Sequence, residues 1–385
     1  MPVHVDGRNI CVLVSQLSYG GAERQTAILL EELAARHGVR PLVCCMSPIL
    51  EPFGSRIQRA GCELVHWPRG KSYETRRVRF LRRLLKERDI ELLHAVHYQA
   101  IAYGWLARLG LRNIAFVPSV RSTVHAPVLR KRAFYRFVLP RCPVVIANSH
   151  SGRLWLEEQY GVDGERVQVV PNGLDPGLVA AAPDRAAVRA HLGIPKDAPV
   201  MAFVGKNVAN KNLPLLFRIF ERVLRRRPDA HLILMGKGLT PECLVSGSDA
   251  HPSVHALGTR DDIYDLIGCA DCLVLTSMSE GFPNAVLEAM VLGVPPVTTK
   301  VGECPLLIDH GEDGYLFDVG DDEGAARLVL EVLGDASLRG AFSRSARTKA
   351  LQRYGTDAMV AATRQVYELA LGRKLHTLPA VAEVS

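Results

Sequence analysis

The feature that most constrains the fold is a repeated alternation of short apolar runs with longer helical patterns. In the first part of the chain, six runs rich in β-branched residues are each bounded by turn residues. They predict strands at 10–15, 41–46, 62–67, 91–96, 114–119 and 143–148. Helical spacing between them predicts helices at 22–36, 75–88, 98–109, 128–138 and 150–160. Strands that alternate with helices form a parallel sheet covered by helices on both faces.

The alternation starts again after a break at residues 171–199, which are rich in Pro, Gly, Ala and Asp. The second round predicts strands at 200–205, 231–236, 253–258, 271–276, 295–300 and 315–319. We therefore predict an α/β protein with two doubly wound, Rossmann-like domains that face each other across a cleft. The expected domains are 1–175 and 199–355 with a linker at 176–198, and a last helix at 357–373 is expected to join the first domain.

Composition and length exclude several classes of protein. The 385 residues are 48% apolar and 23% charged, which is ordinary for a globular protein and argues against a disordered or fibrous chain. No apolar run approaches the roughly 20 residues that span a bilayer, and the start of the chain does not resemble a signal peptide. The nine cysteines lie among apolar neighbours, as reduced, buried thiols do. We expect a cytoplasmic protein.

The net charge of +7 is unevenly distributed, because the basic excess lies in the first 175 residues. Its main clusters are 69–88 and 130–141. Such clusters are either solvated helix faces or surfaces that attract anionic lipid, at about 1 kcal/mol per charge near the membrane. No nucleic-acid-binding motif accompanies them, so we expect no nucleic-acid partner. Peripheral association with the inner face of the membrane is a hypothesis that the charge favours.

The most specific motif begins at the predicted strand 271–276 and continues through a loop into a helix. Glu280 lies in the loop and Glu288 lies eight residues later in the helix. At roughly 100° per residue both carboxylates can face one ligand. Backbone amides between Gly281 and Ala285 lie at the helix start, where the helix dipole favours an anion. Carboxylates beside an anion site suit a ligand that has both hydroxyls and phosphates, such as a nucleotide sugar.

In each predicted domain, the loop after the first strand is also a candidate for phosphate binding. Gly20 and Gly21 allow close approach of a phosphate to the next helix, although they form no complete glycine-rich fingerprint. In the second domain, Gly205 is followed by Lys206 and Lys211, which are either surface lysines or a clamp for a diphosphate leaving group.

These motifs occur together with HAVH at 94–97, VVPNGLD at 169–175 and GTRDDI at 258–263. In this order they resemble the large retaining glycosyltransferase family (family four type, group 1) with the glycosyltransferase-B fold. That family includes phosphatidylinositol mannosyltransferases and many capsule and exopolysaccharide transferases. The resemblance implies that Lys206 and Lys211 bind the donor diphosphate, that Glu280 binds sugar hydroxyls and that Glu288 binds the ribose. The donor-binding residues that it implies are Gly20, Gly21, Gly205, Thr259, Arg260, Gly281, Phe282, Pro283, Asn284, Ala285 and Glu288.

The sequence departs from the family pattern at two places. Arg121 stands where many members carry a histidine near the reacting sugar, while His94 and His97 lie one strand earlier. We group Arg121 with Glu280, Lys206 and Lys211 as candidate catalytic residues. An arginine can bind phosphate or acceptor but cannot act as a base at neutral pH. After the second glutamate, Glu303 replaces a glycine and Leu306 stands where a glutamate is expected.

We predict neither a metal nor a cofactor. The chain contains no D-x-D motif, and Cys269 and Cys272 have no second pair of ligands at metal-binding spacing. The predicted function is a metal-independent hexosyltransferase that retains anomeric configuration. Its donor is a nucleotide sugar (a UDP-sugar favoured, GDP-mannose next), and its acceptor is a saccharide or lipid-linked acceptor of surface polysaccharide biosynthesis. The alternatives are a nucleotide-sugar 2-epimerase of the same fold, a non-catalytic sugar-nucleotide-binding subunit and a membrane-docking scaffold.

Overall fold

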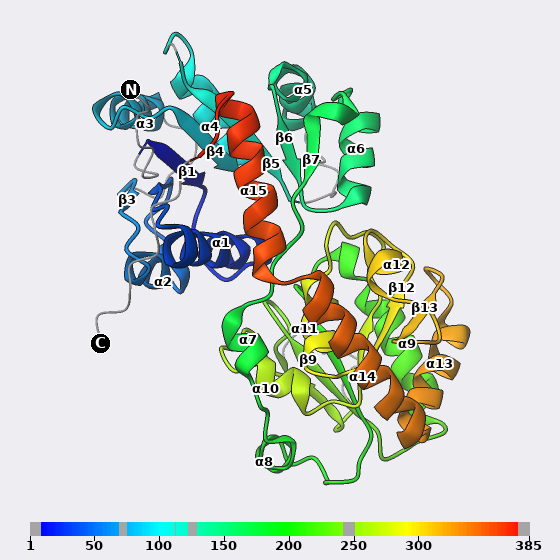
Figure 1. Ribbon diagram of the computed structural model, residues 1–385. Helices are drawn as coiled ribbons and strands as arrows, with labels where there is room; N and C mark the ends of the chain where they lie inside the picture. The colour runs from blue at the N-terminus through cyan, green and yellow to red at the C-terminus, as the bar shows by residue number, and fades with distance from the viewer. Residues whose placement is uncertain (1–8, 69–74, 112, 122–128, 242–250, 376–385) are drawn as a thin grey trace. The chain divides into compact units, whose positions relative to one another are not determined.

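The computed structural model describes residues 9–68, 75–111, 113–121, 129–241 and 251–375 (Figure 1). Part of the basic segment 69–88, residues 69–74, lies outside them. The chain divides into two compact units. Unit 1 comprises residues 1–173 and 356–385, and unit 2 comprises residues 174–355.

Unit 1 is built on a parallel sheet of seven strands in the order β3-β2-β1-β4-β5-β6-β7. Its strands are β1 (Ile10–Val14), β2 (Leu42–Cys45), β3 (Leu64–His66), β4 (Leu92–Val96), β5 (Ala115–Val120), β6 (Val145–Ala147) and β7 (Val167–Val169). Its helices are α1 (Gly21–His37), α2 (Phe53–Arg59), α3 (Thr75–Glu87), α4 (His97–Arg108), α5 (Leu129–Val138), α6 (His150–Tyr160) and α15 (Thr356–Leu371), with short turns η1 (Leu139–Arg141) and η2 (Gly164–Arg166). The six predicted strands are confirmed, and β7 and α2 were not predicted.

Helices cover both faces of this sheet because alternate strand residues are apolar on each side. On one face, Leu92, Val117 and Ile146 pack with residues of α1 and α15. On the other face, Leu93 and Phe116 pack with residues of α3 and α4. The last helix, α15, thus returns to the unit with which the chain begins, where it packs on α1, β4 and β5.

Unit 2 repeats this arrangement with six parallel strands in the order β10-β9-β8-β11-β12-β13. The strands are β8 (Val200–Val204), β9 (His231–Met235), β10 (Val254–Ala256), β11 (Cys272–Leu275), β12 (Pro296–Thr299) and β13 (Tyr315–Phe317). The helices are α7 (Pro176–Ala180), α8 (Arg185–His191), α9 (Leu213–Leu224), α10 (Ile263–Gly268), α11 (Asn284–Val291), α12 (Cys304–Leu307), α13 (Asp322–Gly334) and α14 (Ala336–Arg353), with the short turn η3 (Ala209–Lys211). Every strand predicted in this half is present.

The segment 176–198, expected as a linker, is part of unit 2 and contains α7 and α8. Leu178 and Ile194 are buried in the core of the unit. Arg189 is 3% exposed and donates hydrogen bonds to the carbonyl oxygens of Cys269, Lys196 and Ala198. These buried contacts fix the segment to the unit, so the expectation of a linker is corrected.

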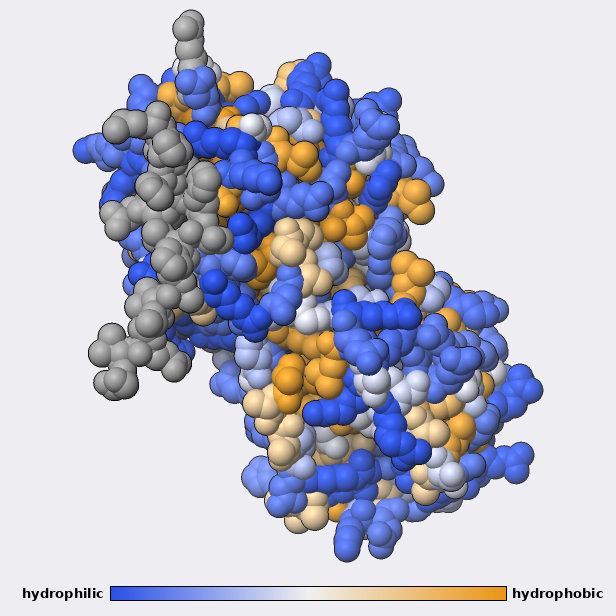
Figure 2. Space-filling model, in the orientation of Figure 1, coloured by the Kyte–Doolittle hydropathy of each residue, from blue (hydrophilic) through white to orange (hydrophobic). Residues whose placement is uncertain are grey.

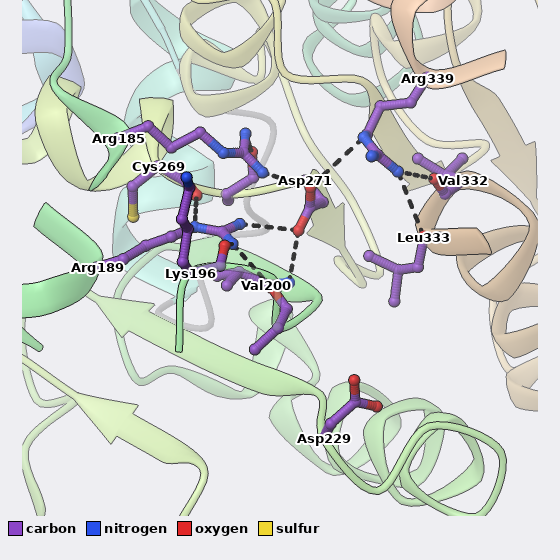
Figure 3. Close-up of polar contacts among 12 residues, drawn as sticks. Arg185, Arg189, Lys196, Val200, Asp229, Cys269, Asp271, Val332, Leu333 and Arg339 are labelled. Carbon is purple, nitrogen blue, oxygen red and sulfur yellow. Dashed lines mark hydrogen bonds and ion pairs between the residues drawn. The ribbon is translucent and has the colours of Figure 1, made fainter. Parts of the chain in front are cut away.

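A buried carboxylate, Asp271, completes this attachment (Figure 3). It accepts hydrogen bonds from Arg189 at 2.9 Å and from the backbone N–H of Val200 at 2.8 Å, and it also pairs with Arg185 and Arg339. Asp271 directly precedes β11 and Val200 begins β8, so the cluster lies at the amino-terminal edge of the sheet. It joins α8 and α14 to the two central strands.

The face that Figure 2 shows is mostly hydrophilic, with apolar side chains in scattered groups. Within the described ranges, no helix has both the length and the apolar character needed to cross a bilayer. Every cysteine that the structure describes is buried and forms no disulfide, as predicted. Burial raises the pKa of the Cys269 thiol to about 11.

Candidate active site

In unit 2 the strand order reverses between β8 and β11, because β9 lies on one side of β8 and β12 on the far side of β11. Ligands of doubly wound sheets bind beyond the carboxyl ends of the strands at such a switch point. The two loops that leave this point are residues 205–212 and 276–283. They carry Lys206, Lys211 and Glu280, so the fold brings these predicted residues to one edge of one sheet.

Lys211 and Glu280 are in direct contact. Lys211 Nζ donates to Glu280 Oε1 at 2.5 Å, and Ser277 Oγ donates to the same oxygen at 2.6 Å. The side chains of Lys211 and Glu280 are 20% and 12% exposed, so the pair is partly shielded from water. Because Glu280 Oε1 accepts from both Lys211 and Ser277, the orientation of this carboxylate is fixed.

Three small polar residues that the sequence analysis did not single out tie the two loops together. Asn210 Nδ2 donates to the carbonyl oxygen of Ser279 at 2.7 Å, and Ser279 Oγ donates to Asn210 Oδ1 at 2.8 Å. Ser277 orients Glu280, as described above. These bonds make the loops one rigid element around the Lys211–Glu280 pair.

The loop after β9 lies against the loop after β8. Gly205 N donates to the carbonyl oxygen of Met235, and Asn207 N donates to that of Lys237, both at 2.9 Å. Gly236, whose φ is +134°, has no room for a side chain because the carbonyl of Gly205 occupies that place. Because Asn207 bonds to the backbone of Lys237, Lys237 is a third lysine at this edge, and it is exposed like Lys206. The pattern Gly-Lys-Gly after a buried strand is the signal that could have identified it.

The start of α11, which the sequence analysis predicted as an anion site, leaves only some of its backbone N–H groups without an acceptor. The helix begins at Asn284, and Pro283 has no N–H to offer. Asn284 N already donates to the carbonyl oxygen of Phe282 at 3.1 Å. Among the described residues, the N–H groups of Gly281, Phe282 and Ala285 have no acceptor. The ring of Phe282 is buried against Tyr354, so its backbone and not its side chain faces the loop.

A glycine of the next loop supports Glu280 from behind. Gly302 has φ +56°, and a side chain there would collide with the backbone carbonyl of Glu280. The neighbouring N–H of Glu303 donates to the carbonyl oxygen of Gly281 at 3.2 Å. The loop after β12 thus holds the backbone that carries Glu280. Leu306, in contrast, is 52% exposed on the short helix α12.

The remaining predicted donor-binding residues of unit 2 lie around this edge. Glu288 is 5% exposed in the second turn of α11. Thr259 is exposed beyond β10, and Arg260 is held by Asp262 through two hydrogen bonds of 2.8 and 2.7 Å. Gly258 N donates to the carbonyl oxygen of Leu239, which joins this loop to the one after β9.

Unit 1 holds the other predicted residues, also at carboxyl ends of strands. Gly20 precedes α1 and Gly21 begins it, and the carboxylate of Glu23 folds back against Gly20. Gln25 of the same helix exchanges two hydrogen bonds with the backbone of Gly173, at 2.9 and 2.8 Å. The helix start therefore fixes the 170–173 loop, and it carries an acidic side chain where a phosphate was expected.

Arg121 directly follows β5 and is 8% exposed. Its Nη1 donates to Asn172 Oδ1 at 3.0 Å. Burial lowers the pKa of Arg121 to about 10, which still leaves it charged at neutral pH. It therefore cannot act as a base there.

The two histidines of the HAVH motif have different surroundings. His94 lies within β4 and its Nδ1 is 2.8 Å from Tyr367 Oη. Burial, together with the charge of Arg121, lowers the pKa of His94 to about 3, so the ring is neutral. His97 begins α4 with φ +68°, a conformation rare outside glycine, at the switch point between β1 and β4.

Two family models match this chain, one over most of unit 1 and the other over most of unit 2. The family "Glycosyltransferase Family 4" matches residues 19–178, and the family "Glycosyl transferases group 1" matches residues 184–349. The D-inositol 3-phosphate glycosyltransferase of Kineococcus radiotolerans is 31% identical over an alignment of 317 residues that covers 74% of this chain and 67% of that protein. The UDP-Gal:alpha-D-GlcNAc-diphosphoundecaprenol alpha-1,3-galactosyltransferase of Escherichia coli is 26% identical over 306 residues, covering 74% and 77% of the two chains.

Among solved structures, Anabaena HepE in complex with UDP superposes with a TM-score of 0.79 at 22% identity, covering 93% of this chain and 99% of that chain. The fold is thus the glycosyltransferase-B fold, as predicted. The chain belongs to the group 1, family 4 glycosyltransferases, and it is an enzyme of that class.

Proposed function

We propose that this glycosyltransferase moves a sugar from a nucleotide-sugar donor to a saccharide or lipid-linked acceptor of surface polysaccharide biosynthesis, with retention of anomeric configuration. A UDP-sugar is the favoured donor and GDP-mannose the next. The name of the Escherichia coli relative supports both the donor and the acceptor that we propose, since it specifies UDP-Gal and a diphosphoundecaprenol-linked acceptor. The UDP complex of HepE supports the choice of base.

The contact between Lys211 and Glu280 at the switch point carries the proposal. Leaving-group departure from a nucleotide sugar develops negative charge on a diphosphate. Lys206, Lys211 and the free amides of Gly281 and Ala285 are donors and charges that stabilise such an anion. Glu280, held by Ser277 and Lys211, would accept hydrogen bonds from hydroxyls of the donor sugar. Glu288 would bind the ribose, and Thr259 with Arg260 would lie near the base.

The enzyme would contribute little general-base chemistry. Arg121 stays protonated, and His94 is buried and engaged by Tyr367. Catalysis would therefore come mainly from holding the leaving diphosphate while the acceptor hydroxyl approaches the same face of the sugar, as a retaining transferase requires.

A turnover assay tests the proposal. The full chain is incubated with UDP-glucose, UDP-galactose, UDP-N-acetylglucosamine or GDP-mannose and a panel of saccharide and polyprenyl-diphosphate acceptors. We expect nucleotide release that depends on the acceptor and a product with the anomeric configuration of the donor by NMR. Interconversion of the donor without acceptor would instead identify a 2-epimerase. Nucleotide binding without turnover on any acceptor would identify a binding subunit.

We also propose that unit 1 associates with the inner face of an anionic membrane through 69–88 and 130–141. On α3, Arg76, Arg79 and Lys86 are exposed. On α5, exposed arginines accompany two exposed apolar side chains, Leu129 (82%) and Phe137 (54%). Basic residues beside exposed apolar ones suit the headgroup region, where charge and apolar burial act together.

Vesicle sedimentation tests this association. We expect binding to vesicles with anionic lipid and not to neutral vesicles, with binding reduced by salt. Replacing Leu129 and Phe137 with Ser should weaken binding, whereas replacing the exposed Leu154 of α6 should not. Equal binding to both kinds of vesicle at all salt concentrations would contradict the proposal.

A further inference from the structure

Four of the buried polar atoms that lack hydrogen-bond partners in the described residues lie on neighbouring strands of the unit 1 sheet, at or toward its carboxyl edge. They are His94 Nε2, Ser119 Oγ, Arg121 Nε and Asn148 Oδ1. They come from β4, β5, the residue after β5 and the residue after β6, which are neighbouring strands. Native proteins leave few such atoms unsatisfied, so a local group of them calls for a specific explanation.

Strand register places these side chains on one face of the sheet. His94 is paired with Val117, and Ser119 and Arg121 follow Val117 by two and four residues. Asn148 follows Ile146 by two. Val117 and Ile146 both pack with Tyr367 of α15, so the four polar side chains extend this apolar face toward the edge where ligands bind.

The charge of Arg121 distinguishes this cluster from an ordinary buried polar network. In the described part of the chain, Arg121 forms no ion pair, and its only hydrogen-bond acceptor is the neutral Asn172 Oδ1. Arg189 of unit 2 is a useful contrast. It is 3% exposed, and it has the carboxylate of Asp271 and three carbonyl oxygens as partners. A buried charge without a counterion is costly unless something else compensates it.

The available donors match an oxyanion. Arg121 supplies Nε–H and Ser119 supplies a hydroxyl. His94 supplies Nε2–H if Tyr367 donates to its Nδ1, the arrangement that a neutral ring permits. A sugar hydroxyl would satisfy hydrogen bonds but would leave the arginine charge unbalanced. A phosphate or carboxylate does both.

The arginine is also held in place. Asn172 accepts from Arg121 Nη1, and the adjacent Gly173 is fixed to α1 by its two hydrogen bonds with Gln25. Asn148 Nδ2 donates to the carbonyl oxygen of Arg121 at 3.5 Å. Asn172 thus restrains the guanidinium and Asn148 restrains the backbone of Arg121, and such preorganisation is what an anion-binding site requires.

We propose that Arg121, Ser119 and His94 form an oxyanion subsite in unit 1 that holds a negatively charged group of the acceptor, a phosphate or a carboxylate. This inference rests on the proposed transferase function. It narrows the acceptor class to anionic saccharides and lipid-linked phosphates, and it gives Arg121 a binding role.

The test uses the full chain and inorganic phosphate as the probe, in the presence of saturating UDP so that the unit 2 site is filled. We expect millimolar phosphate to raise the melting temperature of the wild type. Arg121→Gln should weaken the apparent phosphate affinity at least tenfold, and Ser119→Ala should weaken it several-fold. Arg121→Lys should retain part of it. The matched control is Arg136→Gln, which removes an exposed arginine of α5 from the same unit and should leave the affinity unchanged.

Two results would overturn the inference. One is a phosphate response that is the same in Arg121→Gln and wild type. The other is a response that disappears when UDP is present, which would assign the phosphate to the donor site. Stabilisation by UDP alone is recorded for every variant, because it reports correct folding. If UDP and GDP fail to stabilise even the wild type, the proposed function is wrong. If UDP stabilises all variants and the phosphate response is the same with and without Arg121, only the proposed subsite is wrong.

Discussion

Lys211 Nζ lies 2.5 Å from Glu280 Oε1, although the two residues are 69 positions apart in the chain. One follows β8 and the other follows β11, the two strands between which the order of the unit 2 sheet reverses. Each side chain restrains the other. The contact therefore places a cation and a carboxylate together where a ligand with phosphates and hydroxyls would need them.

Replacing either member of this pair should impair turnover more than folding. We predict that Lys211→Ala and Glu280→Ala each lower kcat/KM by more than about tenfold, equivalent to about 1.4 kcal/mol of barrier, because the leaving diphosphate or the sugar loses its partner. Steady-state kinetics with a UDP-sugar measure this. Lys196→Ala, an exposed lysine of unit 2 at the opposite edge of the sheet, is the control and should be neutral. A folded Lys211→Ala variant with near-normal turnover would refute the assignment.

Glu288 should affect donor affinity and leave the chemical step largely intact. It is buried in the second turn of α11, and the proposed contact is with the ribose. We predict that Glu288→Ala raises the dissociation constant for UDP by about tenfold, about 1.4 kcal/mol, with a smaller change in kcat. Isothermal titration with UDP measures it, and Glu288→Gln should be intermediate. An unchanged affinity in the Ala variant would rule out the ribose role.

The buried Asp271 cluster should govern the stability of unit 2. Asp271→Asn leaves Arg189 buried without a counter-charge, so we predict a loss of about 3 kcal/mol in the free energy of unfolding. Urea denaturation measures the loss. Asp229→Asn is the matched control, because it breaks an exposed pair with Arg227 that contributes less than about 1 kcal/mol. Equal effects of the two substitutions would contradict a structural role for the cluster.

The strands could be predicted from the sequence because those of a parallel sheet are buried on both faces and form continuous apolar runs, as in 10–15 and 271–276. β7 was missed because it is a short strand at the sheet edge, in which Gln168 and Val169 are only half-buried. The 176–198 segment was misjudged because its loop-like composition conceals Arg189, whose partners lie up to 82 residues away.

The residues of the candidate site could likewise be predicted only in part from the sequence. Lys211 and Glu280 could be chosen because charged residues follow apolar strands in a recognisable pattern. Asn210, Ser277 and Ser279 could not, since small polar residues are common in loops and only the folded chain reveals which of them pair. The unsatisfied Ser119 and Asn148 were invisible for the same reason, because burial without a partner is a property of the fold.

His94 should make stability fall in mild acid. Its pKa is lowered to about 3 in the folded state, whereas an unfolded histidine titrates near 6.5. As the pH falls below about 6.5 only the unfolded state takes up the proton, so stability is constant above that pH and declines toward pH 3. We predict about 1.4 kcal/mol less stability at pH 5.5 than at 7.5 from this residue.

Urea denaturation of wild type and His94→Gln at both pH values isolates that contribution. The variant loses contacts at every pH. The fall in its free energy of unfolding between pH 7.5 and pH 5.5 should nevertheless be about 1.4 kcal/mol smaller than the fall in the wild type. His37→Gln, which removes a histidine that is less buried than His94 and whose pKa is also lowered, should reduce this pH-dependent difference in stability less. Identical pH dependence of wild type and His94→Gln would contradict the neutral, buried state of His94.

A thermal-shift screen with UDP, GDP and ADP sugars tests whether unit 2 holds a nucleotide-sugar donor. A ligand at 100 times its dissociation constant stabilises the folded state by about 2.7 kcal/mol, which is readily seen as a rise in melting temperature. We predict stabilisation by UDP and UDP-sugars, unaffected by a chelator and reduced in Lys211→Ala. No stabilisation by any nucleotide sugar at saturating concentration would contradict it.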